Sequence, residues 1–374
     1  MSTKKSIVVI GGLPSSLINF RGDFLRALMA DGWTVTAMAG GASEEDRAAV
    51  EALGVSYRDY PIQRNGLSVK SDLQTFFALR RALADIKPDV VFSYTIKPVI
   101  WGGLATRFAG RPKFLALITG LGFTFQKSGF LKSILRGVVS QLYKLSLMGA
   151  SKVIFQNSDN RQVFESRGLV KPSKAVQVSG SGVNIERYVE TPIDTNETKF
   201  LLIARLLYDK GISEYIEAAK IVKARYPQAR FLLVGPGDPS PNAFPIETVT
   251  QLDKEGVIEY LGEAADVRPH LQGCQIYVLP SYHEGLPRTV IEAMSTGRPV
   301  ITTDVPGCRD TVIEGETGLL VPVKDAVALS EGMMTMIEKR EAWQEMGRAG
   351  REFAERTFDV NKVNRDLLSY IHEA

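Results

Sequence analysis

The chain has 374 residues, which is enough for two domains of ordinary size. Its 44% hydrophobic and 23% charged residues are typical of a soluble globular protein, and no run of roughly eighteen apolar residues predicts a membrane span. Two cysteines, Cys274 and Cys308, argue against a disulfide framework or a zinc site and favour a reducing cytoplasm. The opening KKSIVVIGG has too short an apolar run for a signal peptide and predicts a buried first strand.

The net charge of +3 is unevenly distributed along the chain. Residues 1–170 carry 22 Lys and Arg against 12 Asp and Glu, whereas residues 171–374 carry 23 against 30. Between Val90 and Ser158 there are nine Lys and Arg and no acidic residue. This asymmetry predicts an anionic surface or partner for the first half of the chain.

Short β-rich runs alternate with helical patterns through both halves of the chain, which predicts parallel sheets. In the first half, strands are expected at 6–12, 33–40, 55–62, 89–94, 114–120 and 152–157, and helices at 21–31, 44–53, 72–86 and 130–147. After a polar linker at 186–199, strands are expected at 199–206, 229–238, 257–262, 276–281, 299–305 and 318–323, with a helix at 213–227.

The fold class is therefore α/β, with two Rossmann-like, doubly wound domains in tandem. We place a first domain at 1–188, a second at 189–352, and a C-terminal helix at 353–374 that crosses back to the first domain. Ligands of such sheets bind outside the carboxyl ends of the strands.

The run LLIARLLYDKG places two cations after a strand. The strand should end near Arg205, which leaves Arg205 and Lys210 at its carboxyl edge, and Gly211 then begins a helix. An arginine grips phosphate oxygens with two parallel hydrogen bonds, and a lysine acts as a mobile point charge. Taken alone, the run is better read as two solvated cations on a loop.

The run HEGLPRTVIEAM places two carboxylates eight positions apart. The strand before it should end at Ser281, and Gly285 and Pro287 form a turn whose backbone N–H groups can bind an anion. Carboxylates accept hydrogen bonds from vicinal hydroxyls, so Glu284 and Glu292 would each suit a sugar. Alternatively, Glu284 is merely an acid near a helix N-terminus and Glu292 a solvated helix position.

In combination, the Arg205–Lys210 loop and the E-x7-E run EGLPRTVIE resemble the retaining nucleotide-sugar glycosyltransferases of family four, as do GSGVNIERY, LLVGPGD and GETGLLVP. The resemblance implies the GT-B fold, in which two domains face a central cleft. It implies that Arg205 and Lys210 bind the donor diphosphate, that Glu292 holds the ribose, and that Glu284 contacts the transferred sugar. It further assigns to the donor site the backbone of Gly285 and Leu286, together with Gly235, Gly11 and Gly12.

One part of the first domain departs from the family pattern. The histidine that many relatives place near the transferred sugar is not evident, and the matching stretch is FSYTIKP. That stretch offers Thr95 and Lys97 instead. Lys97 would either meet an acceptor phosphate or be a surface cation.

No metal and no cofactor are expected, because the chain has no D-x-D motif and no His/Cys cluster with ligand spacing. Arg205, Lys210 and helix dipoles would neutralise the leaving group of a UDP-sugar donor. The resemblance implies that the anomeric configuration is retained. Front-face attack, with the donor phosphate taking the acceptor proton, is a hypothesis, and no protein nucleophile is assigned.

The segment 130–147 predicts an amphipathic helix. Its apolar stripe consists of Leu131, Ile134, Leu135, Val138, Leu142 and Leu145, and its basic stripe of Lys132, Arg136 and Lys144. With Phe125 and Phe130 beside it, this pattern favours an anionic membrane surface rather than nucleic acid. The alternative is a core-facing helix with a solvated basic side.

A membrane surface suggests a lipid-linked acceptor. The runs TGLGFTF and SQLYKLS resemble the subgroup that extends undecaprenyl-diphosphate-linked sugars, among them N-acetylgalactosaminyltransferases. The expected enzyme therefore works in the cytoplasm, peripherally bound to the inner face of the cell membrane, with GalNAc as the favoured donor sugar. Three alternatives stay open: a sugar-nucleotide 2-epimerase, a glycosyltransferase with a soluble acceptor, and a non-catalytic membrane-binding module that would leave the four charged residues without a role.

Overall fold

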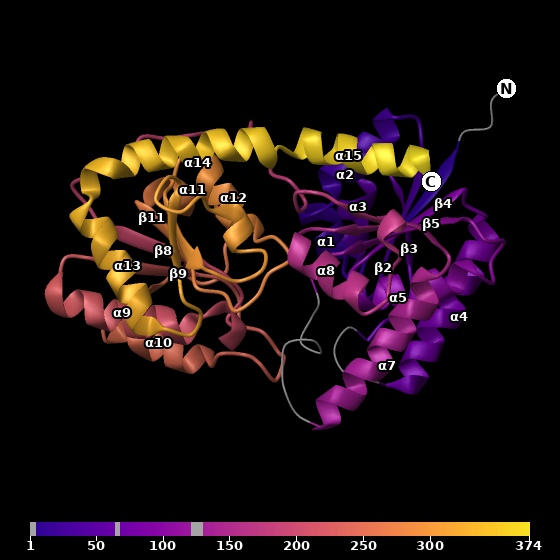
Figure 1. Ribbon diagram of the computed structural model, residues 1–374, viewed down its shortest axis with the longest axis horizontal. Coiled ribbons are helices and arrows are strands. Elements are labelled where there is room, and N and C mark those ends of the chain that lie inside the picture. Colours follow the sequence, from indigo (N-terminus) through magenta and orange to yellow (C-terminus); the bar gives the residue numbers. More distant parts are fainter. Residues whose placement is uncertain (1–4, 64–67, 121–129) are drawn as a thin grey trace. The chain divides into compact units, whose positions relative to one another are not determined.

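The computed structural model describes residues 5–63, 68–120 and 130–374, with side chains from residue 136 onward in the last range. The chain divides into two compact units (Figure 1). Unit 1 comprises residues 1–181 and 360–374, and unit 2 comprises residues 182–359. The boundaries expected from the sequence, 188/189 and 352/353, both fall inside unit 2.

The described part of unit 1 forms a seven-stranded parallel sheet with the order β3-β2-β1-β4-β5-β6-β7. Its strands are β1 (Ser6–Ile10), β2 (Thr34–Ala39), β3 (Ser56–Asp59), β4 (Val90–Tyr94), β5 (Lys113–Ile118), β6 (Ala150–Phe155) and β7 (Ala175–Gln177). Its helices are α1 (Pro14–Asn19), α2 (Gly22–Ala30), α3 (Glu44–Glu51), α4 (Val69–Ile86), α5 (Ile96–Thr106), α7 (Phe130–Leu147), α8 (Ser158–Ser166) and α15 (Val360–Glu373).

Helices cover both faces of this sheet, as the alternation of β1 shows. Val8 and Ile10 pack into the core beneath α4, α5 and α7, whereas Ile7 and Val9 pack into the core beneath α1, α2 and α15. The yellow C-terminal helix α15 lies beside α2 (Figure 1). A hydrogen bond of 3.0 Å from the Tyr370 hydroxyl to the Gln177 carbonyl also fastens it to unit 1.

The described part of unit 2 forms a six-stranded parallel sheet with the order β10-β9-β8-β11-β12-β13. Its strands are β8 (Lys199–Ile203), β9 (Arg230–Val234), β10 (Glu259–Tyr260), β11 (Ile276–Leu279), β12 (Val300–Thr303) and β13 (Gly318–Val321). Its helices are α9 (Ile212–Arg225), α10 (Ile246–Lys254), α11 (Arg268–Gly273), α12 (Arg288–Ser295), α13 (Ala326–Glu338) and α14 (Trp343–Thr357).

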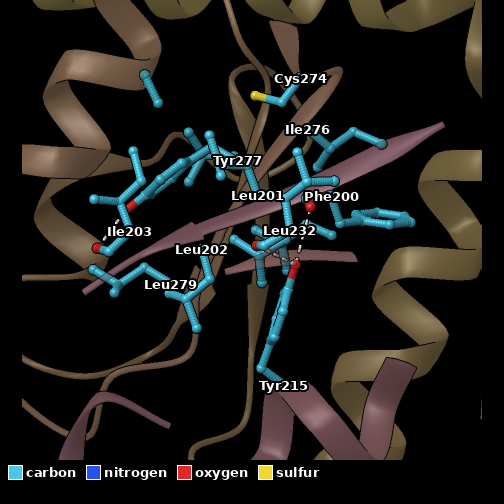
Figure 2. Close-up of a cluster of buried hydrophobic side chains, with 14 of the residues drawn as sticks. Phe200, Leu201, Leu202, Ile203, Tyr215, Leu232, Cys274, Ile276, Tyr277 and Leu279 are labelled. Carbon is cyan, nitrogen blue, oxygen red and sulfur yellow. Dashed lines mark hydrogen bonds between the residues drawn. The ribbon is translucent and has the colours of Figure 1, made fainter. Parts of the chain in front are cut away.

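The central strand β8 is fixed by two buried tyrosines (Figure 2). The Tyr215 hydroxyl donates to the Phe200 carbonyl at 3.0 Å, and the Tyr277 hydroxyl donates to the Ile203 carbonyl at 3.2 Å. A buried tyrosine needs such a partner, because an unpaired hydroxyl in the core costs stability. These bonds hold both ends of β8, including the carboxyl end from which the candidate site begins.

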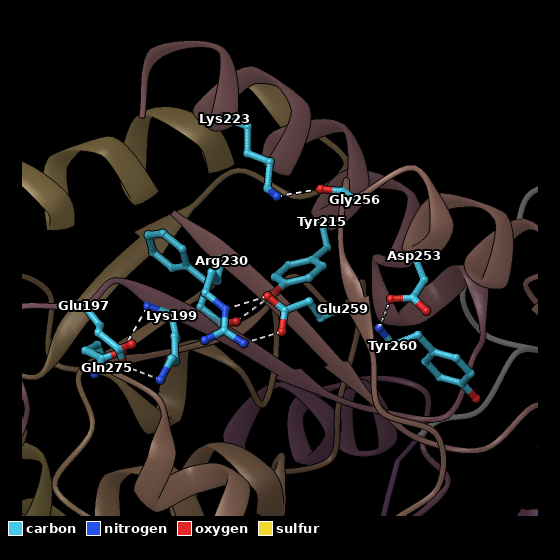
Figure 3. A network of polar contacts seen from close by, with 11 residues as sticks. Glu197, Lys199, Tyr215, Lys223, Arg230, Asp253, Gly256, Glu259, Tyr260 and Gln275 are labelled. Carbon is cyan, nitrogen blue, oxygen red and sulfur yellow. Dashed lines mark hydrogen bonds and ion pairs between the residues drawn. The ribbon is translucent and has the colours of Figure 1, made fainter. Parts of the chain in front are cut away.

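A polar network ties the amino ends of the unit 2 strands together (Figure 3). Arg230 of β9 makes two hydrogen bonds, of 2.6 and 2.5 Å, to Glu259 of β10. The Lys199 backbone N–H at the start of β8 donates to Gln275 at 2.9 Å. These contacts lie at the edge opposite to the carboxyl ends of the strands, where doubly wound sheets bind ligands.

The strands expected from the sequence lie near their predicted positions, whereas β7 was not expected, and α7 has the predicted bounds. The expected helix 353–374 is two helices, since α14 ends at Thr357 and α15 begins at Val360. In unit 1, the sequence did not predict helices α1, α5 and α8. No helix in the described residues is long and apolar enough to cross a bilayer.

Candidate functional site

The strand order of unit 2 reverses direction between β8 and β11, and this is the position at which doubly wound sheets bind ligands. The loop after β8 carries Arg205 and Lys210. The loop after β11 carries Glu284 and leads into α12, which carries Glu292. The two predicted motifs therefore flank the switch point of one sheet.

Three contacts fasten the β8 loop to the β11 loop, and a fourth fastens the β11 loop to α9. The Lys210 Nζ lies 2.5 Å from the Glu284 Oε1, and both side chains are largely buried. The Tyr282 backbone N–H donates to the Asp209 carbonyl at 2.8 Å, and the Ser281 hydroxyl donates to the same carbonyl at 3.1 Å. The Tyr282 hydroxyl also donates to the carboxylate at the first turn of α9, Glu214, at 2.7 Å. The lysine and the glutamate thus face each other from a rigid frame.

Two glycines bring backbone close to the Glu284 loop. A Cβ at Gly211 would overlap the Pro280 carbonyl, and a Cβ at Gly307 would overlap the Glu284 carbonyl. Both glycines have positive φ, 74° and 83°, which other residues rarely adopt. The Glu284 backbone N–H donates to the Pro306 carbonyl at 3.2 Å. Glu284 is therefore held between two close-packed loops.

Arg205 is the more open of the two cations, with 58% of its side chain exposed. Its guanidinium pairs with Asp238, in the loop after β9, at 2.6 Å. Burial works to raise the pKa of Asp238, but hydrogen bonds from Ser240 and the charge of Arg205 leave that pKa below its usual value. An anion arriving at Arg205 would have to compete with this carboxylate.

Glu292 is only 6% exposed, so the alternative of a solvated helix position is wrong. Its Oε1 accepts a hydrogen bond of 2.8 Å from the Tyr188 hydroxyl and one of 2.9 Å from the Arg288 Nε. Burial raises the pKa of Glu292, and Arg288 and Tyr188 oppose that rise. Gly285 is buried and Leu286 packs against the core, so the turn before α12 is anchored too.

The glycines assigned to the donor site have packing reasons of their own. A Cβ at Gly235 would overlap the Ala204 carbonyl, and a Cβ at Gly11 would overlap the Tyr94 hydroxyl. Gly12 is also buried, after the carboxyl end of β1. Their contact with a diphosphate stays a prediction.

The switch point of unit 1 lies between β1 and β4. After β4, Thr95 has a φ of 69°, an uncommon conformation for a β-branched residue. Lys97 is 13% exposed and pairs with Asp72 of α4 at 2.8 Å. Lys97 is therefore not a surface cation, and an acceptor phosphate would have to displace Asp72.

Helix α7 turns a different side to the core from the one its leucines predict. Val139, Tyr143 and Leu147 are buried, whereas Val138 and Leu145 are 52% and 45% exposed. Helix α7 therefore does face the core, as the alternative expects, and Leu142 of the predicted apolar stripe packs against it, but Val138 and Leu145 of that stripe do not. On the basic stripe, Lys144 is exposed and Arg136 partly so; Phe125 lies outside the described residues, as do the side chains of Phe130 and Lys132.

Residues 186–353 match the family of group 1 glycosyl transferases, and residues 19–157 match the glycosyl transferase 4-like family. A Campylobacter jejuni protein, N,N'-diacetylbacillosaminyl-diphospho-undecaprenol alpha-1,3-N-acetylgalactosaminyltransferase, is 31% identical over 299 residues, covering 76% of this chain and 77% of the relative. This chain belongs to the group 1 glycosyltransferases. The glycosyltransferase also resembles the Escherichia coli UDP-Gal:alpha-D-GlcNAc-diphosphoundecaprenol alpha-1,3-galactosyltransferase, at 26% identity over 71% of this chain and 70% of the relative.

Solved structures confirm the GT-B fold of this glycosyltransferase. Sucrose-phosphate synthase from Thermosynechococcus elongatus has a TM-score of 0.80 at 20% identity, covering 99% of this chain and 98% of the other. Anabaena HepE in complex with UDP has a TM-score of 0.79 at 18% identity, and the match covers 99% of this chain and 100% of HepE. The fold expected from the sequence is thereby confirmed, and the family expected from the sequence is confirmed by the matches above.

Sequence reasoning missed the partners of the predicted residues in this glycosyltransferase. Asp238 ends the LLVGPGD run and Tyr188 ends the GSGVNIERY run, so both lay in quoted motifs. Neither run indicates that its last residue pairs with Arg205 or Glu292. Glu214 and Gly307 carry no motif signal at all.

Proposed function

We propose that this glycosyltransferase moves a sugar from a UDP-sugar to an undecaprenyl-diphosphate-linked saccharide in surface glycan synthesis, with retention and without a metal. The observation that carries the proposal is the Lys210–Glu284 pair at the switch point of unit 2. It brings a cation suited to a diphosphate within one hydrogen bond of a carboxylate suited to sugar hydroxyls.

Donor binding would use the two cations and the turn before α12. The diphosphate competes with Asp238 for Arg205 and with Glu284 for Lys210. Once the diphosphate engages Lys210, the Glu284 carboxylate accepts hydrogen bonds from the transferred sugar. The backbone N–H groups of Gly285 and Leu286 lie next to it at the turn.

In the reaction, an acceptor hydroxyl oxygen bonds to the anomeric carbon on the face from which UDP departs. The bond between that carbon and the phosphate oxygen breaks, UDP keeps the electron pair, and the hydroxyl proton passes to a phosphate oxygen of the leaving group. Arg205 and Lys210 stabilise the charge that develops on the diphosphate, so fixed cations supply what a metal would otherwise supply.

The acceptor is proposed from the relatives and from α7. The Campylobacter and Escherichia proteins are both named for diphosphoundecaprenol-linked acceptors, and the first is an N-acetylgalactosaminyltransferase. GalNAc is therefore the proposed donor sugar. Exposed Val138, Leu145 and Met148 beside Lys144 suit the inner face of an anionic membrane, where peripheral binding would meet the lipid-linked acceptor.

A thermal-shift panel of UDP-, GDP- and ADP-sugars tests donor binding. We expect UDP-GalNAc to raise the melting temperature, because a ligand that binds only the folded state stabilises it. A chelator should leave both the shift and the turnover unchanged. If no nucleotide sugar stabilises the protein, the proposal fails; turnover of UDP-GalNAc without any acceptor would favour the epimerase instead.

A further inference from the structure

We infer that Arg288 and Tyr188 are positioning residues for Glu292: they fix its Oε1 and so present its Oε2 to the vicinal hydroxyls of the donor ribose. The inference rests on the proposed function and on the ribose contact that the family resemblance implies for Glu292. It adds which side chains set the orientation and the charge of that carboxylate.

One oxygen of the Glu292 carboxylate accepts hydrogen bonds within the protein, and the other can accept them from a ligand. Among the described residues, both hydrogen bonds to Glu292 end on Oε1, at 2.8 Å from Tyr188 and 2.9 Å from Arg288. Arg288 is one helical turn before Glu292 on α12, on the side of the sheet's carboxyl edge. With Oε1 held by two donors, Oε2 has a fixed direction and free lone pairs.

A second set of contacts fixes Tyr188 itself. Arg351 of α14 donates from Nη1 to the Tyr188 carbonyl at 2.5 Å and to the Ser295 carbonyl at 2.6 Å. Ser295 is the last residue of α12. Tyr188 is thus tied at its hydroxyl to the middle of α12 and at its backbone to the end of the same helix, so its position does not depend on Glu292 alone.

The electrostatics give Arg288 a second role. Burial raises the pKa of Glu292, and the charge of Arg288 opposes that rise more than any other neighbour. The other groups that face the carboxylate are Tyr188 and Arg187 from the segment before β8, and Tyr277 of β11. Removing Arg288 would raise the pKa of Glu292 further. Since a protonated carboxyl is the poorer acceptor for two hydroxyls, donor affinity would then fall at a higher pH than in the wild type.

The chain supplies a matched control in the same unit. Tyr226 donates to Glu338 at 2.8 Å, and Arg225 pairs with Glu338 at 3.1 Å. This triad has the same residue types, but it lies at the end of α9, on the edge away from the site. Y226F and R225Q therefore remove the same groups as Y188F and R288Q.

The experiment measures kcat and the KM of donor and acceptor for R288Q, R288K, Y188F, R225Q and Y226F, from weakly acidic to weakly basic pH. We expect R288Q to raise the donor KM by roughly 10- to 100-fold, the cost of losing one charge-assisted hydrogen bond. The acceptor KM and kcat should stay within about twofold, because Glu292 is remote from the bond that breaks. R288K keeps the positive charge but not the hydrogen-bond geometry, so it should restore the pH profile more than the donor KM. Y188F should raise the donor KM by about fivefold.

Two results would overturn the inference: a donor KM of R288Q and Y188F equal to that of R225Q and Y226F, or an R288Q pH profile that coincides with the wild-type profile. If R288Q does not fold, Y188F decides, since it removes one hydroxyl only. If the wild type turns over and the R288Q and Y188F variants behave like it, only this inference fails. Wild-type protein that binds no UDP-sugar defeats the proposed function, and this inference with it.

Discussion

Glu284 is the residue on which the proposed chemistry depends most. Its carboxylate faces Lys210 at 2.5 Å and is largely buried. Replacing Glu284 by Gln keeps the shape but weakens the hold on Lys210 and on sugar hydroxyls. We expect turnover to fall by about 100-fold or more, while affinity for UDP, which lacks the sugar, changes little. Steady-state kinetics and UDP titration check this, with exposed Glu338→Gln as the control; full turnover of E284Q would remove Glu284 from the site.

Gly307 supports Glu284 from the backbone. Gly307→Ala would drive a Cβ into the Glu284 carbonyl and impose a φ of 83° on alanine. Gly315→Ala is the matched control, because its φ is 76° but nothing lies within 4 Å of the added Cβ. Both variants should lose about 1 kcal/mol of unfolding free energy for the backbone conformation.

Only G307A should also lose turnover, since only it displaces Glu284. Denaturant unfolding and kinetics together separate the two effects. Equal activities of G307A and G315A would show that the close approach at Gly307 does not position the carboxylate.

At the scale of single elements, α7 is where sequence and structure differ most. Its bounds follow from its periodicity, but the same residues supply a second stripe, and Val139, Tyr143 and Leu147 of that stripe face the core. Tertiary packing decides which stripe faces the core. Helix α7 packs so close to α5 at Ser146 that a Cβ at Gly103 of α5 would overlap the Ser146 side chain. That close contact joins positions far apart in the sequence.

Helix α5 itself escaped prediction for a related reason. Its sequence contains Pro98, Gly102 and Gly103, which are poor helix formers. In the fold, the two glycines sit where a side chain would strike Ser93 and Phe114. Close packing against the sheet therefore overrides the local propensity.

The membrane prediction belongs to α7. Val138→Asp combined with Leu145→Asp places two charges on exposed positions, so the fold should tolerate both. We expect binding to anionic vesicles to fall by about tenfold or more, because two apolar side chains no longer enter the interface. UDP-sugar affinity should be unchanged.

Co-sedimentation with vesicles measures this, and Val327→Asp on α13, also exposed, is the control. Vesicle binding by the double variant at the level of V327D would contradict a membrane role for α7.

At the scale of the whole molecule, the strands of both sheets could be predicted from the sequence, but the side-chain partners of the candidate site residues could not. Buried parallel strands are continuous apolar runs, and each run here became a strand near the predicted position. The motifs also indicated which loops carry charge. Their partners could not be predicted, because they join distant positions: Tyr188 and Glu292 are 104 residues apart and Lys210 and Glu284 are 74 apart. Only the folded sheet brings them together.

The reactivity of the two buried cysteines measures whether unit 2 is folded. Burial raises the pKa of Cys274 and of Cys308 to about 12. Because the thiolate is the reactive form, the native protein at mildly alkaline pH should resist alkylation, and both thiols should react once the unit opens. A bound UDP-sugar should slow the reaction by stabilising the folded state. Mass spectrometry after timed alkylation checks this; rapid labelling of the native protein would contradict the packing described for unit 2.

The most direct test of the account is product analysis by mass spectrometry after incubation with UDP-GalNAc and an undecaprenyl-diphosphate-linked saccharide. The account predicts that one N-acetylhexosamine is added to the lipid-linked acceptor, that UDP is released in equal amount, and that Glu284→Gln lowers the rate of both by about 100-fold or more. An unchanged acceptor together with an epimerised or intact UDP-sugar would contradict it.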